Sequence, residues 1–229
     1  RIFLCRGRHC ERLSSEMKFR TLPEDESPID FVQGGDMDID PIFVDVSKAA
    51  ITDKTRAIII GGDIAYANGN IGNSGRWDSW FKNMNKTMYS PDGHLIPLII
   101  AIGNHEVNGY PGGPIDKAPF YFNHFPQNGS TSYFVRKLGA HSVLFVLDSD
   151  HISPHGGAQA NWLAEQLEKY KNVKNKMAVY HVPLYPSNRD YEGEKSKDGR
   201  NNWLPLFDKY GLTLAFENHD HTLKRTKLL

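Results

Sequence analysis

The chain has 229 residues, of which 39% are hydrophobic and 24% are charged, a composition typical of one globular domain rather than a disordered or fibrous protein. Its 27 basic and 27 acidic side chains give a formal net charge of zero, so the overall field would attract neither nucleic acid nor an anionic membrane. No apolar stretch reaches the ~18 to 20 residues of a membrane span. Partner choice must therefore come from a local site.

The first 25 residues lack strand and helix periodicity and are predicted to form a tail or linker, followed by one domain over residues 26–229. Cys5 and Cys10 are the only cysteines, and a local disulfide and two reduced thiols are both open. Two glycosylation triplets begin at Asn85 and Asn128. They suit a glycoprotein that is secreted or otherwise extracytoplasmic.

From Ile29 onward, apolar runs alternate with helical patterns, which predicts an α/β fold. Gly211 is expected to end the last helix. Long loops are expected between Tyr66 and His94 and from Val107 to Tyr133, where Gly, Asn and Pro are frequent. The predicted elements, in chain order, are a strand near 31–32, a helix near 42–50, strands at 57–60 and 98–102, a helix from 158 to about 171, a strand at 177–180, a helix at 202–210 and a strand at 212–216.

Four of the predicted strands are followed by side chains that can bind metal ions. In an open α/β sheet, the carboxyl ends of the strands are where sites are built. Carboxylate, amide, phenol and imidazole groups at four such ends indicate a metal-dependent hydrolase. The candidates are Asp63 and Tyr66 after 57–60, Asn104 and His105 after 98–102, His181 after 177–180, and His219 and His221 after 212–216.

Two metal ions about 3.5 to 4 Å apart can hydrolyse a phosphate ester, because they activate water and offset charge on the phosphoryl oxygens. Asp63 is the natural bridge between two ions, since Gly61 and Gly62 let the backbone turn tightly before it. His219 and His221 would point to opposite sides of an extended strand, so a turn must redirect at least one. The remaining histidines are expected to be structural or exposed (His9, His94, His124, His141, His151 and His155).

The chain resembles the calcineurin-like metallophosphoesterases and, among them, the purple acid phosphatases. The resemblance covers roughly residues 15–226, and a tyrosine in the second motif singles out the purple group. It implies two stacked mixed β-sheets flanked by helices, a four-layer α/β/β/α fold with a dimetal site at the strand ends. The motifs are Gly-Asp at 35–36, Gly-Asp-x-x-Tyr at 62–66, Gly-Asn-His-Glu at 103–106, His181 and His-x-His at 219–221.

The resemblance also implies a role for each site residue. Asp36, Tyr66 and His221 would hold a ferric ion, and Asn104, His181 and His219 a divalent zinc, manganese or iron. Asp63 would bridge the two ions, and His105 would contact the substrate phosphate and assist the leaving group. The implied enzyme is an acid phosphatase that hydrolyses small phosphate monoesters by in-line attack of a metal-bound hydroxide, with neither nucleic acid nor membrane as partner. The oligomeric state is open.

The sequence departs from the family pattern at two glycine positions and in one loop. Asp38 and Asn218 stand where the family has glycine, and asparagine tolerates positive φ better than most residues. Arg189 and Asp190 precede Tyr191 where plant-type members carry a histidine, which leaves Asp190 as a speculative substitute for the leaving-group acid.

Both ends of the chain differ from the plant-type pattern as well. Residues 14–23 are similar to the segment that follows an N-terminal fibronectin-like domain in plant-type enzymes. The chain stops eight residues after His221, so the catalytic domain over 26–229 is expected to be incomplete at its C-terminus. A phosphodiesterase or nucleotide pyrophosphatase on the same core, and a non-catalytic binding module of the same fold, remain alternatives.

Overall fold

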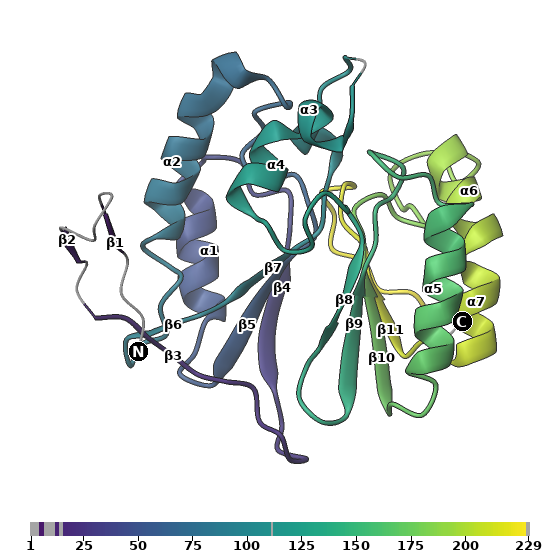
Figure 1. Cartoon of the computed structure of the whole chain (residues 1–229), viewed down its shortest axis with the longest axis horizontal. Helices are drawn as coiled ribbons and strands as arrows, with labels where there is room; N and C mark the ends of the chain where they lie inside the picture. Colours follow the sequence, from purple (N-terminus) through teal and green to yellow (C-terminus); the bar gives the residue numbers. More distant parts are fainter. Residues whose placement is uncertain (1–4, 7–11, 14–15, 111, 228–229) are drawn as a thin grey trace.

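The computed structural model describes residues 5–6, 12–13, 16–110 and 112–227, and in these ranges a pair of larger β-sheets stands face to face (Figure 1). The first has the order β4-β5-β7, formed by Asp30–Gly34, Thr55–Ile60 and Leu98–Ile100, and its three strands are parallel. The second has the order β11-β10-β9-β8 and is mixed, because β8 runs antiparallel to β9. Its strands are Phe134–Lys137 (β8), Ser142–Val146 (β9), Asn175–Val179 (β10) and Leu214–Phe216 (β11).

Helices cover the outer face of each sheet (Figure 1). Helices α1 (Ile42–Ala50) and α2 (Ser74–Met84) lie beside the first sheet, and α5 (Ala158–Lys169) and α7 (Leu204–Tyr210) lie beside the second. The α/β/β/α layering predicted from the sequence is confirmed. The remaining short elements are β1 (Cys5–Arg6), β2 (Arg12–Leu13), β3 (Lys18–Phe19), β6 (His94–Leu95), two 3-10 helices, η1 (Ile71–Asn73) and η2 (Asn104–Glu106), α3 (Pro114–Lys117), α4 (Pro119–His124) and α6 (Glu194–Asn202).

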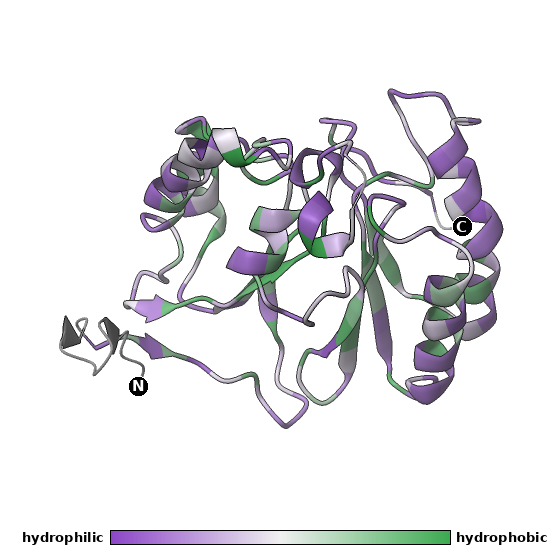
Figure 2. Cartoon of the chain, turned by 45° about the horizontal axis from the view of Figure 1, so that its top comes forward, coloured by the Kyte–Doolittle hydropathy of each residue, from purple (hydrophilic) through white to green (hydrophobic). Residues whose placement is uncertain are grey.

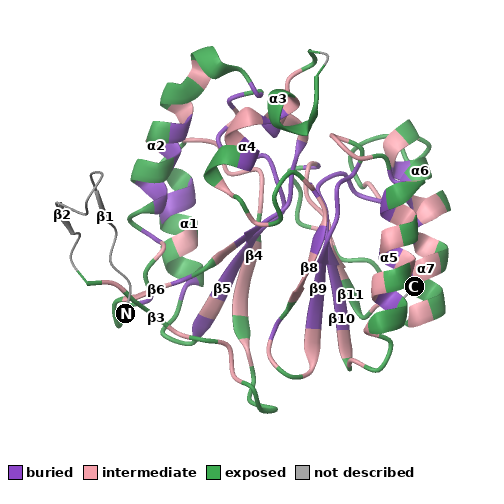
Figure 3. Cartoon of the chain, viewed as in Figure 1, coloured by how far each residue is buried: buried purple, intermediate pink, exposed green. Residues whose placement is uncertain are grey.

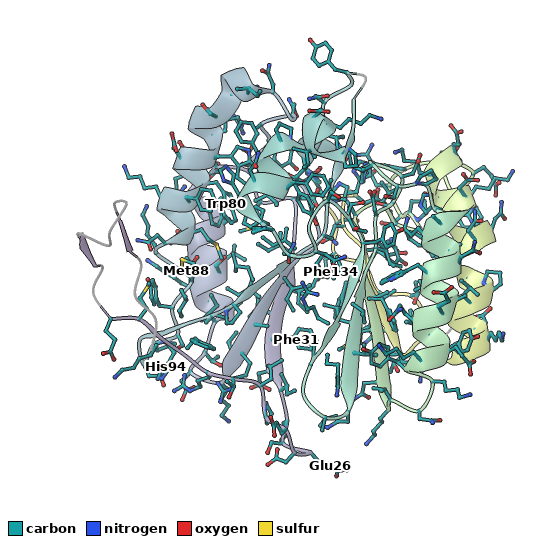
Figure 4. All side chains as sticks on the ribbon, in the orientation of Figure 1. Glu26, Phe31, Trp80, Met88, His94 and Phe134 are labelled. Atoms are coloured by element: carbon teal, nitrogen blue, oxygen red, sulfur yellow. The ribbon has the colours of Figure 1, made fainter. Side chains whose placement is uncertain are left out.

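Apolar side chains fill the three spaces between the four layers. In β5, Ile58 and Ile60 pack toward α1 and α2, whereas Ile59 packs between the two sheets. Both faces of this strand are buried, which explains its unbroken apolar run. Phe31 and Phe134 lie between the sheets (Figure 4). Hydrophobic residues line the strands, and buried residues continue to the strand ends where the loops begin (Figures 2 and 3).

The predicted helix at 42–50 is confirmed, and Gly211 ends α7 with the left-handed φ of 62° expected of a C-terminal glycine. The helix predicted at 202–210 is wrong at its start, because α6 ends at Asn202 and α7 begins at Leu204. The region from 66 to 94 is not one long loop, since it contains α2. Its buried Trp77, Trp80 and Met84 follow a helical spacing that the surrounding glycines and asparagines obscure.

The N-terminal segment makes contacts with the domain. Strand β3 pairs in parallel with β6, and Arg20 forms an ion pair with Asp92. The boundary near residue 25 stays a prediction. Cys10 and the side chain of Cys5 lie outside the described residues, and no helix in the described ranges is long and apolar enough to cross a membrane.

His155 is a buried structural histidine, 1% exposed, with its ring 4.5 Å from that of Trp203. Neither ring nitrogen has a hydrogen-bond partner among the described residues. Burial lowers the pKa of His155 from 6.5 to about 4. The unfolded chain therefore binds a proton first as the pH falls, so stability is lost between pH 6.5 and about 4.

We expect this loss to reach about 3 kcal/mol, and the substitution His155→Phe should remove it while keeping a ring against Trp203. Urea unfolding of both proteins at pH 7.5, 5.5 and 4.5 measures the difference. His94→Phe, at a half-buried position on β6, is the control. Parallel pH profiles for wild type and His155→Phe would contradict the prediction.

Candidate metal centre

Five strand ends bring the predicted ligands to one edge of the two sheets (Figure 1). On the first sheet, Asp36 follows β4, Asp63 and Tyr66 follow β5, and Asn104 follows β7. On the second sheet, His181 follows β10, and His219 and His221 follow β11. Because the strands are parallel within each sheet, their carboxyl ends share one edge of that sheet. The contact of Asn104 with His181 shows that the two edges meet.

The backbone at this edge is held in an unusual conformation. Eight described non-glycine residues have positive φ, between 47° and 70°. Such conformations each cost roughly 1 to 3 kcal/mol and tend to cluster at functional sites. His219 and His221 are both among them. The left-handed backbone at these two positions explains how residues that would point to opposite sides of a strand can face the same centre. The predicted ligands in this set are Asp36, Asp63, Tyr66, His219 and His221.

The first group of ligand atoms surrounds Nε2 of His181. This nitrogen lies 3.0 Å from Asp63 Oδ2, 3.0 Å from Asn104 Oδ1 and 3.0 Å from His219 Nδ1. The other ring nitrogen, Nδ1, lies 2.9 Å from the carbonyl oxygen of Gly61 and so donates to it. Nε2 is therefore left to face atoms that mostly carry lone pairs, and such an arrangement fits a cation.

The pKa values of His181 and Asp63 depend on each other, because the two side chains are in contact. Burial alone would lower the pKa of His181, but the hydrogen bond and charge of Asp63 outweigh burial and raise it. Conversely, burial opposes ionisation of Asp63, but His181 outweighs it and lowers the pKa of the carboxyl group. Burial, followed by the nearby charges of His181 and Arg189, lowers the pKa of His219 to about 4. His219 is thus neutral near pH 7, as metal ligation requires.

The second group joins Asp36, Tyr66 and His221. His221 Nε2 lies 3.2 Å from Asp36 Oδ1 and 3.1 Å from the phenol oxygen of Tyr66. Asp36 Oδ2 accepts from the backbone N–H of His219 at 2.9 Å, which ties this group to the first. Burial, then the charges of Asp36 and Asp63, raises the pKa of Tyr66. A phenolate here therefore requires a cation beside it.

Glu106 supports the backbone under Asp63, a role that the sequence analysis missed. It is 1% exposed, and its carboxylate accepts from the N–H groups of Asp63 (2.7 Å), Ile64 (2.8 Å) and Gly103 (2.9 Å). Burial and the charge of Asp63 raise the pKa of Glu106 to about 7. The signal was present in the sequence as the fourth residue of Gly-Asn-His-Glu, but two of its three partners, Asp63 and Ile64, are distant along the chain.

His105 lies at the accessible side of the centre. Its side chain is 33% exposed, its ring stacks on Tyr66 with centroids 4.0 Å apart, and its N–H donates to Asp63 Oδ1 at 2.8 Å. Nδ1 hydrogen-bonds to the amide oxygen of Asn68. Asn68 therefore fixes the tautomer and leaves Nε2 to face a ligand, a second role that the sequence analysis missed.

Known protein families offer a comparison for this fold. The calcineurin-like phosphoesterase family model matches residues 32–223, a range that covers most of the chain and contains the candidate ligands. The chain belongs to the calcineurin-like phosphoesterase family. This is a family of metal-binding hydrolases that act on phosphate esters.

Three curated relatives are similar over most of the chain. Probable purple acid phosphatase 20 of Arabidopsis thaliana is 28% identical, over 93% of this chain and 49% of the relative. Uncharacterized protein Rv2577 of Mycobacterium tuberculosis is 26% identical, over 90% and 45%. Probable inactive purple acid phosphatase 1 of Arabidopsis thaliana is 27% identical, over 80% and 32%. This calcineurin-like phosphoesterase chain spans half the length of these relatives or less.

The departures from the purple acid phosphatase pattern have structural explanations. Asp38 has φ of 54°, a conformation that glycine adopts most easily, and it forms an ion pair with Arg76. Arg76 also donates to the carbonyl oxygen of Ala65 at 2.7 Å, and so connects the two loops that carry Asp36 and Tyr66.

Asn218 does not use positive φ, contrary to the expectation, and the left-handed residue is His219. The Asn218 side chain fills the space above Gly61, because a Cβ added at Gly61 would lie 1.8 Å from Asn218 Nδ2. Its amide donates to the carbonyl oxygen of Tyr180 at 3.1 Å.

The structure also places two further residues singled out in the sequence. His151, expected to be structural or exposed, hydrogen-bonds to Ser149, and its ring lies 5.6 Å from that of His181. Asp190 caps its own loop by accepting from the N–H of Glu192 at 2.9 Å, which gives it a local role rather than a place in either ligand group.

Proposed function

We propose that this chain hydrolyses phosphate monoesters at a dinuclear centre of purple acid phosphatase type. The observation that carries the proposal is the convergence of Asp63, Asn104 and His219 on Nε2 of His181, whose Nδ1 is already engaged by a carbonyl oxygen. The ligand atoms of Asp63, His181 and His219 lie within 4.8 Å of one another. In this proposal Asn104, His181 and His219 hold a divalent zinc, manganese or iron ion.

Asp36, Tyr66 and His221 are proposed to hold the ferric ion, with Asp63 as the bridge. Asp36 Oδ1 supports this, because it is buried and accepts no hydrogen bond in the described structure. The two ions would supply an activated water and positive charge near the phosphoryl oxygens. A phenol whose pKa is raised by burial, as for Tyr66, needs such a charge to ionise.

His105 is the proposed contact to the substrate phosphate. Because Nδ1 donates to the amide oxygen of Asn68, the Nε2 atom can donate to a phosphate oxygen only when the ring carries a second proton. The stacked Tyr66 ring restricts the imidazole on one side, and the bond from the His105 N–H to Asp63 fixes its backbone. The substrate class is a small phosphate ester.

An extracytoplasmic location is also proposed. Asn85 and Asn128, which begin the two glycosylation triplets, are exposed. Mass spectrometry of the native protein for glycans on these two residues tests the proposed location, and finding both asparagines unmodified would remove its support.

The decisive test of the proposed function is a metal count and a visible spectrum on protein purified without chelator. We expect two metals per chain, one of them iron, with a broad visible band that Tyr66→Phe abolishes because the phenolate ligand is gone. Tyr110→Phe, at an exposed tyrosine, should leave the band unchanged. Two metals without colour would indicate an ordinary metallophosphoesterase site, and no metal would favour a binding module.

Turnover completes the test, because two relatives carry the word inactive in their names. We expect p-nitrophenyl phosphate to be hydrolysed faster than its bis-ester. A higher rate on the bis-ester would contradict the proposed monoesterase activity and indicate a phosphodiesterase on the same core.

A further inference from the structure

Arg189 contacts the segment after β11 that carries His219 and His221, although its own side chain is largely exposed. Its Nε lies 3.3 Å from Asp220 Oδ1, and Nη2 donates to the carbonyl oxygen of His219 at 3.4 Å. The Asp220 side chain is only 3% exposed, whereas the Arg189 side chain is 54% exposed. A buried carboxylate thus anchors one side of a guanidinium whose other side remains accessible.

Asp220 also fixes the loop that carries Arg189. Asp220 Oδ2 accepts from the backbone N–H groups of Ser187 at 2.9 Å and Asn188 at 3.2 Å. The loop between β10 and α6 is therefore attached to the segment between the two histidines after β11. As a result, the position of Arg189 relative to His219 and His221 is set by direct contacts rather than by loop flexibility.

A guanidinium is suited to bind an anion here and unsuited to move a proton. It stays protonated at all ordinary pH values and has five N–H donors, of which one donates to the carbonyl oxygen of His219 while the charge pairs with Asp220. The remaining donors can bind a phosphate or carboxylate in a paired geometry. Arg189 contacts the carbonyl oxygen of His219, so it lies next to the segment that carries two of the candidate ligands, His219 and His221.

We propose that Arg189 is a specificity-determining residue that binds a second anionic group of the substrate, such as the adjacent phosphate of a phosphoanhydride, next to the phosphoryl group at the ligand cluster. This inference rests on the proposed function. The favoured substrates are then those with two neighbouring phosphates, and esters with a neutral leaving group gain nothing from Arg189.

Binding of two inorganic anions tests this without requiring turnover. Isothermal titration of the purified protein with phosphate and with pyrophosphate, with metal content checked afterwards, gives the ratio of the two affinities. We expect pyrophosphate to bind about tenfold tighter or more, from one added charged hydrogen-bonding group. Arg189→Gln should remove this preference while phosphate affinity stays within about threefold. Arg225→Gln, at an exposed arginine, is the matched control and should keep it.

Three results would overturn the proposal: no preference in the wild type, a preference that survives Arg189→Gln, or an equal loss for both anions. The last would indicate that Arg189 only supports His219. Rates on ATP and p-nitrophenyl phosphate should show the same selective effect. If the wild type hydrolyses no ester, the proposed function fails, but the binding ratio still decides the role of Arg189.

Discussion

The substitution Asp63→Asn is expected to abolish metal retention and to lower phosphate-ester hydrolysis by on the order of 10²- to 10³-fold or more. The amide keeps an oxygen for the N–H of His105, but it removes the charge that faces Nε2 of His181 at 3.0 Å. The fold should persist because the N–H of Asp63 still bonds to Glu106. Metal analysis and kcat/KM on p-nitrophenyl phosphate measure the two effects.

The matched control is Asp208→Asn, at an exposed aspartate in α7. It should change neither metal content nor rate. Full metal content together with wild-type turnover in Asp63→Asn would contradict both the bridging role of Asp63 and the dinuclear site.

The largest stability effect is expected at Glu106. In Glu106→Ala, the N–H groups of Asp63, Ile64 and Gly103 lose their acceptor in a buried place. Each unsatisfied group costs about 1 to 3 kcal/mol, so we expect a loss of about 3 kcal/mol or more in the free energy of unfolding. Glu106→Gln should fall between Ala and wild type, since one carboxylate oxygen becomes an NH₂ group that cannot accept.

Urea unfolding at pH 7.5 checks this order, with Glu165→Gln on the exposed face of α5 as the control within about 0.5 kcal/mol. If Glu106→Ala were as stable as the control, the carboxylate could not be the acceptor that holds these two loops together.

The fold was readable from the sequence where the signal is local. The run Ala57 to Ile60 is apolar at every position because β5 is buried on both faces, and this pattern alone indicates a central strand. Helix α2 was missed because its Trp77 and Trp80 lie in a segment rich in glycine and asparagine, where composition suggests a loop. Tertiary packing of the two indoles decides the structure there.

The candidate site was only partly readable, for the same reason. His181 and His219 each follow an apolar run closely, so the parallel neighbours β10 and β11 place them together. Asp63 follows β5 of the other sheet and joins them because the two sheets pack against each other. Asp36 follows a short, half-buried strand and was reached only through resemblance. Glu106, Asn68 and Arg189 act through hydrogen bonds to residues 30 or more positions away, which no local pattern predicts.

The division of the ligands between the two sheets has a mechanical consequence. Asp36, Asp63, Tyr66 and Asn104 belong to one half of the molecule, and His181, His219 and His221 to the other. A cation shared by these groups would cross-link the halves at their open edge, where the apolar layer between the sheets ends. Binding of the cation would then stabilise the packing of the two sheets against each other. Cation affinity and the rigidity of the inter-sheet layer should therefore rise and fall together.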